Sequence, residues 1–212
     1  LGAGYGSAGE RCMAISVAVC VGDAAAETLI AKLKPMVEGL RIGPGDKDNP
    51  DMGPLVTCQH RDKVKGYIDA GEVEGATLLV DGRGLKVKGH EDGFYLGGTL
   101  FDRVTPEMTI YKEEIFGPVL SVIAFDDEKE AIRIANDTDF GLAAGVWTSN
   151  LSRGHRVAKK LRAGSVWVNY WDGGDMTAPF GGFKQSGNGR DKSLHAFEKY
   201  TELKATWINL KS

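Results

Sequence analysis

Cys12 is the residue whose type and setting in this sequence best suit covalent chemistry. It ends the segment Gly9-Glu10-Arg11-Cys12, which follows a glycine-rich approach and leads into the apolar run 13–21. A thiolate is a strong nucleophile, and small neighbours let a substrate carbonyl come close while a buried strand fixes the sulfur. Free cysteine also packs often as a small hydrophobic residue. The local sequence therefore leaves a nucleophile and a structural thiol both open.

A second stretch with chemical potential is Glu113-Glu114-Ile115-Phe116-Gly117-Pro118. Taken alone, Glu114 is best interpreted as a solvated surface acid, because most glutamates are exposed.

Other chemistries find little support in the sequence. The segment 4–9 fits the dinucleotide-loop pattern G-x-G-x-x-G, but the strand before it and the helix after it are missing. The four histidines have no ligand spacing with one another or with the cysteines, so we expect no metal site; they are His60, His90, His155 and His195.

Composition narrows the class of protein. With 212 residues, 42% of them hydrophobic and 26% charged, the chain is long enough for one large α/β domain. A formal net charge of -3 without basic clusters argues against nucleic acid and membrane surfaces as partners. No apolar stretch has the length of a membrane span, and the start lacks the features of a signal peptide. Three irregularly spaced cysteines suit a reducing compartment, so we expect a cytoplasmic protein.

The elements that must position Cys12 can be read from periodicity. Buried strands are predicted at 15–21, 76–80, 119–125, 142–148 and 165–169. Helices are predicted at 23–38, where Pro35 should cause a bend or an early end, from a Thr57 cap to about 69, and at 151–161. Asp127 and Glu130 fit a capping box for a further helix. Strand, helix and strand in succession indicate an α/β fold with a mostly parallel sheet flanked by helices.

The last third of the chain contains loops of glycines and aromatics, including Phe180, which either line a substrate tunnel or anchor an irregular loop. Residues 200–210, from Tyr200 to Leu210, alternate well enough to predict a strand. A terminal apolar strand is an edge that needs a partner.

Together the Cys12 and Glu114 stretches resemble the aldehyde dehydrogenase superfamily, whose nucleophile lies in a Gly-Gln/Glu-x-Cys motif and whose cofactor segment reads Glu-Ile-Phe-Gly-Pro. The resemblance implies that the Cys12 thiolate attacks an aldehyde and that its backbone N–H is one oxyanion donor. It also implies that NAD or NADP is the cofactor of the complete enzyme. Glu114 matches the residue that binds the nicotinamide-ribose hydroxyls, and Phe116 matches the aromatic beside it.

Two subfamilies are recognisable. Up to about residue 126 the chain is similar to methylmalonate-semialdehyde dehydrogenase, which releases an acyl-coenzyme A. There the arginine before the nucleophile pairs with the substrate carboxylate, a role that transfers to Arg11. From about residue 128 the chain is similar to a dehydrogenase of γ-glutamyl-γ-aminobutyraldehyde. In the family, the segment that matches the surroundings of Phe180 shapes the aldehyde entrance. The strand that matches residues 200–210 helps to build the subunit interface, so we expect a homo-oligomer.

The resemblance covers the C-terminal catalytic half of a family member. It predicts a catalytic domain at 1–199 and an oligomerisation strand at 200–212. The nucleotide-binding domain, the general base and the asparagine of the oxyanion hole all lie upstream in the family, so we expect this chain alone to lack dehydrogenase activity and not to bind NAD. Two alternatives remain: a residual Cys12-dependent esterase, or an inactive oligomerisation module.

Overall fold

The computed structural model describes residues 1–47 and 49–210, which form two compact units. The first unit is Leu1–Thr138, and the second begins at Asp139. The predicted division into a catalytic domain and an oligomerisation strand between residues 199 and 200 stays a prediction. The last two residues of the predicted C-terminal segment, 211 and 212, lie outside the described residues.

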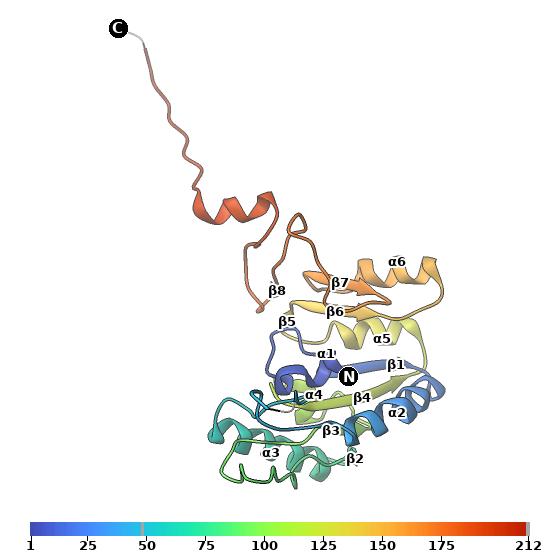
Figure 1. The fold of residues 1–212 in the computed structure, drawn as a ribbon. Helices are drawn as coiled ribbons and strands as arrows, with labels where there is room; N and C mark the ends of the chain where they lie inside the picture. The colour runs from blue at the N-terminus through green and yellow to red at the C-terminus, as the bar shows by residue number, and fades with distance from the viewer. Residues whose placement is uncertain (48, 211–212) are drawn as a thin grey trace. The chain divides into compact units, whose positions relative to one another are not determined.

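The first unit is built on a four-stranded sheet whose strand order is β1-β4-β3-β2 (Figure 1). β1 and β4 run parallel, as do β4 and β3, whereas β3 and β2 are antiparallel. The mostly parallel sheet predicted from the strand and helix order is therefore confirmed. The strands are β1 (Val17–Val21), β2 (Thr77–Val80), β3 (Thr99–Asp102) and β4 (Val119–Phe125).

The core of this unit surrounds β4, which lies between β1 and β3. Its first five residues are buried, and Val122 is fully buried. A strand covered on both faces has no polar face, which explains why six of the seven residues of β4 are apolar; the exception, Ser121, is buried. The helices are α1 (Gly2–Tyr5), the 3-10 helix η1 (Gly6–Gly9), α2 (Asp23–Glu38), α3 (Cys58–Val73), α4 (Thr109–Lys112) and α5 (Glu128–Ala135).

Two helices differ in length from their predictions. α2 does not end early at Pro35 but continues to Glu38, because a proline in the last turn removes a single hydrogen bond and the Gly39 N–H still bonds to the Pro35 carbonyl, at 3.0 Å. α3 begins after the predicted cap: Thr57 Oγ1 accepts from the backbone N–H of His60 at 3.1 Å. It runs one turn beyond the predicted end.

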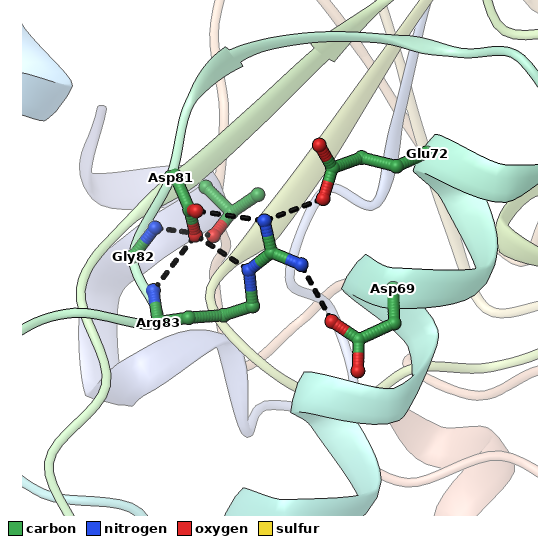
Figure 2. Close-up of polar contacts among 6 residues, drawn as sticks. Asp69, Glu72, Asp81, Gly82 and Arg83 are labelled. Carbon is green, nitrogen blue, oxygen red and sulfur yellow. Dashed lines mark hydrogen bonds and ion pairs between the residues drawn. The ribbon is translucent and has the colours of Figure 1, made fainter.

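An ion-pair cluster around Arg83 ties α3 to the chain that follows β2 (Figure 2). The guanidinium contacts Asp81 at 2.7 Å, Asp69 at 2.5 Å and also Glu72. Asp69 and Glu72 both belong to α3. Hydrogen bonding from Arg83 holds the pKa of Asp81 below its usual range. The cluster therefore restrains α3, the helix that also contacts the loop around Phe116.

The second unit contains a parallel strand pair joined by a helix: β6 (Ala143–Val146), α6 (Leu151–Lys160) and β7 (Ser165–Val168). This confirms the predicted β-α-β order. A short antiparallel pair, β5 (Phe140–Gly141) and β8 (Phe183–Lys184), completes its strands.

The predicted strand at 200–210 does not form in this chain. The 3-10 helix η2 (Leu194–Tyr200) takes up its first residue, and residues 201–210 have no regular secondary structure and are exposed (Figure 1). Trp207 is 93% exposed. Alternation makes a segment suitable for a sheet, but a strand forms only when another edge supplies hydrogen bonds.

Candidate functional site

Cys12 lies in a turn before β1, not at the start of the strand itself. The Ala14 N–H bonds to the Arg11 carbonyl at 3.1 Å and closes this turn. Three successive residues before it, from Ser7 to Gly9, have φ values of 53°, 57° and 69°. This left-handed bend is costly for Ser7, and the surrounding structure must hold it. Cys12 emerges exposed at the surface of the first unit.

The two predicted motifs pack directly against each other. A Cβ added at Gly9 would lie 2.1 Å from the Gly117 carbonyl oxygen, so this approach requires glycine. A Cβ added at Gly117 would in turn lie 2.7 Å from Val64 Cγ2 on α3. The backbone that leads to Cys12 and the backbone that follows Phe116 are therefore in contact.

The second motif presents two exposed side chains around a buried one. Ile115 is 5% exposed and anchors the loop, whereas Glu114 and Phe116 are exposed. Phe116 has a φ of 55°, which is rare outside glycine. The exposed Glu114 carboxylate can accept hydrogen bonds from sugar hydroxyls, and the Phe116 ring can pack beside a sugar, so both side chains are available for the ribose contact that the resemblance predicts.

One face of α3 supports this loop. His60, Val64 and Tyr67 follow one another at helical spacing and share that face. His60 Nε2 lies 2.7 Å from the Phe116 carbonyl oxygen, and the Tyr67 hydroxyl donates to Glu113 at 2.6 Å. The Glu113 carboxylate raises the pKa of Tyr67 to about 12. α3 therefore holds the loop at both ends.

The carboxylate of Glu10 links the Cys12 turn to the beginning of α3. Its side chain is 8% exposed, accepts from the Val56 N–H at 3.1 Å, and lies 3.5 Å from His60 Nε2. The sequence did not single out His60, because its histidines were tested only for metal-ligand spacing. Tyr67 was not singled out either, because its helical spacing is equally typical of a core residue. The spacing of His60, Val64 and Tyr67 on a helix was the signal that could have found them.

The remaining predicted residues occupy different units. Arg11 is exposed in the first unit, where its Nε–H donates to Ser7 Oγ at 2.9 Å. Phe180 belongs to the second unit, and the Lys192 ammonium lies 5.6 Å from its ring centroid. Phe180 also lines a hollow of about 260 Å³, together with Leu142, Arg190 and Lys199 among others.

Within residues 1–47 and 49–210, no three His, Cys, Asp or Glu side chains gather as ligands for a metal ion. None of the helices in this described part of the chain has the length and apolar character needed to cross a membrane.

Comparison with known proteins identifies the family. A model described as the aldehyde dehydrogenase family matches residues 1–206. The malonate-semialdehyde dehydrogenase of Pseudomonas aeruginosa is 52% identical over 202 residues, which cover 93% of this chain and 39% of the relative. The NADP/NAD-dependent aldehyde dehydrogenase PuuC of Escherichia coli is 45% identical over 204 residues, or 96% of this chain and 40% of the relative.

Solved structures agree with these matches. An indole-3-acetaldehyde dehydrogenase in complex with NAD⁺ superposes with a TM-score of 0.87 at 52% identity, over 96% of this chain and 40% of that one. The methylmalonate-semialdehyde dehydrogenase of Oceanimonas doudoroffii gives a TM-score of 0.91 at 40% identity, over 99% of this chain and 44% of that one. The chain thus spans about two fifths of the length of the curated relatives named here. It belongs to the aldehyde dehydrogenase family.

Proposed function

We propose that this chain is the catalytic portion of an NAD(P)-dependent aldehyde dehydrogenase and that Cys12 is its nucleophile. The observation that carries the proposal is the direct packing of the Cys12 segment against the Glu114 segment at Gly9 and Gly117. Family membership gives this contact its chemical meaning, because residues 1–206 match the family model.

The chemistry begins at the sulfur of Cys12. Its thiolate forms a bond to the aldehyde carbon, and the carbonyl electron pair moves to oxygen. The backbone N–H of Cys12 stabilises that oxyanion as one hydrogen-bond donor. The nicotinamide group, when bound, supplies the hydride acceptor that aldehyde oxidation requires. Glu114 would hold the ribose through its hydroxyls, and Phe116 would pack beside it.

Arg11 gives the proposal its substrate class. A guanidinium beside the nucleophile suits a carboxylate on the aldehyde, and Ser7 Oγ holds the Arg11 side chain from its Nε side. The name of the Pseudomonas relative also specifies a semialdehyde of a carboxylic acid. We propose such a semialdehyde as substrate, with water or coenzyme A as acyl acceptor. The role of Phe180 as a further substrate contact stays a prediction from the family resemblance.

A second candidate function follows from the exposure of Cys12. Hydrolysis of an activated ester through a Cys12 thioester needs no hydride acceptor, so the chain alone could carry it out.

The exposed apolar residues after Tyr200 support the proposal that a second copy of this chain pairs with residues 200–210.

Reconstitution tests the dehydrogenase proposal. The chain is mixed with the upstream segment of the Pseudomonas relative, and NADH formation is followed with malonate semialdehyde. We expect activity that neither piece has alone and that Cys12→Ser abolishes. Arg11→Gln should raise KM for the semialdehyde far more than for an uncharged aldehyde. Activity that survives Cys12→Ser would overturn the proposal.

A further inference from the structure

We propose that His60 is a positioning residue that links the Cys12 turn to the Phe116 loop: its Nε2 bonds to the Phe116 carbonyl and lies beside the Glu10 carboxylate. The inference rests on the proposed function for its catalytic meaning, since the two loops hold the proposed nucleophile and the proposed ribose contact. Its structural content concerns Glu10, His60 and Phe116 alone.

The geometry requires a proton on Nε2 of His60. The nearest atom is the Phe116 carbonyl oxygen at 2.7 Å, and a carbonyl oxygen only accepts hydrogen bonds. Nε2 must therefore be the donor, whether the ring is neutral or charged. The Glu10 carboxylate, also an acceptor only, lies 3.5 Å from the same nitrogen. The Nε2–H group thus bonds to the Phe116 carbonyl, and the Glu10 carboxylate lies 3.5 Å from the same nitrogen.

Both the Glu10 carboxylate and the Phe116 backbone need a restraint of the kind that His60 provides. Glu10 is 8% exposed, and a buried carboxylate is costly unless hydrogen bonds compensate for lost water. The Val56 N–H supplies one such bond, and His60 provides the adjacent polar contact. Phe116 has a left-handed backbone that persists only where its surroundings restrain it, and the bond to its carbonyl is such a restraint.

His60 is itself held in place by two contacts, so it can restrain both loops. Its backbone N–H is fixed by the Thr57 cap at the start of α3, and its ring meets the Phe116 ring edge-on with centroids 6.5 Å apart. Removal of the imidazole should loosen both loops together. A glutamine can offer an amide N–H from a similar distance along the side chain, so His60→Gln should preserve the link in part.

The test is amide hydrogen exchange on the full chain, resolved by residue with NMR. His60→Leu should accelerate exchange roughly tenfold at residues 10–13 and at 115–117, the effect of losing one ordinary hydrogen bond. His60→Gln should recover most of the protection. Gln59→Leu, at an exposed neighbouring position on α3, is the matched control and should change neither loop.

A second measurement on the unsubstituted chain needs no variant. Long-range proton–nitrogen spectra distinguish the histidine tautomers, and neutral His60 should carry its proton on Nε2. An unprotonated Nε2 would overturn the inference, even if His60→Leu failed to fold. Exchange that accelerates in only one loop, or in neither, would also overturn it. Neither readout requires NAD or turnover, so loss of the proposed function would not affect the result.

Discussion

Substitution of Gly9 by alanine tests the contact between the two motifs most severely. The new Cβ would lie 2.1 Å from the Gly117 carbonyl oxygen, at a residue whose φ is 69°. The left-handed conformation costs an alanine about 1–2 kcal/mol, and forcing backbone apart costs about 1–3 kcal/mol more. We therefore expect Gly9→Ala to lower the free energy of unfolding by roughly 2–5 kcal/mol.

Gly66→Ala is the matched control. Gly66 lies within α3, and an added Cβ there would meet nothing within 4 Å. Its replacement should stabilise the protein by roughly 0.8–1 kcal/mol through helix propensity. Urea unfolding followed by far-UV circular dichroism measures both, because all four tryptophans lie after residue 138 and their fluorescence reports on the second unit. An unchanged midpoint for Gly9→Ala would refute the proposed close packing.

Three further results are expected. Thr57→Ala removes the cap of α3 and should cost about 1 kcal/mol in urea unfolding, whereas Thr57→Ser should cost little. Tyr67→Phe should remove one phenol that ionises near pH 12 in an ultraviolet pH titration, because the hydrogen bond to Glu113 raises the pKa of Tyr67 to about 12. Arg83→Met should destabilise the protein near neutral pH by about 1 kcal/mol after solvent screening. Because the folded-state pKa of Asp81 is lowered, this stabilisation is complete above the unfolded pKa and is lost as pH falls through the folded value, so wild type and variant should converge in acid.

The sequence predicted the bounds of helices and strands well where a local signal, such as an apolar run or a capping residue, determines them. The strand at 119–125 has the predicted bounds, because a central strand buried on both faces is mostly apolar, with Ser121 as the one polar residue of this strand. The Thr57 cap was readable because a side-chain oxygen must satisfy the free N–H groups of a helix start. α3 extends one turn beyond its predicted end, where the ion pairs of Arg83 with Asp69 and Glu72 stabilise its last turns.

Features that depend on distant partners were not predictable in this way. Residues 200–210 have the alternation of a strand, but a pattern cannot show whether a second edge is available. The role of His60 arises from two loops that meet only after folding. Cys12 and Glu114 were singled out by their motifs, and the assignment of their chemistry stays a prediction.

The most direct test of the central claim is acylation of the chain by an activated ester. Intact and peptide mass spectra would locate the acyl group among Cys12, Cys20 and Cys58, and neutral hydroxylamine would show whether it is a thioester. We expect a hydroxylamine-sensitive adduct on Cys12 that Cys12→Ser abolishes and Cys58→Ser leaves intact. An adduct that forms on Cys58 at an equal or greater rate would contradict the assignment of Cys12 as the nucleophile.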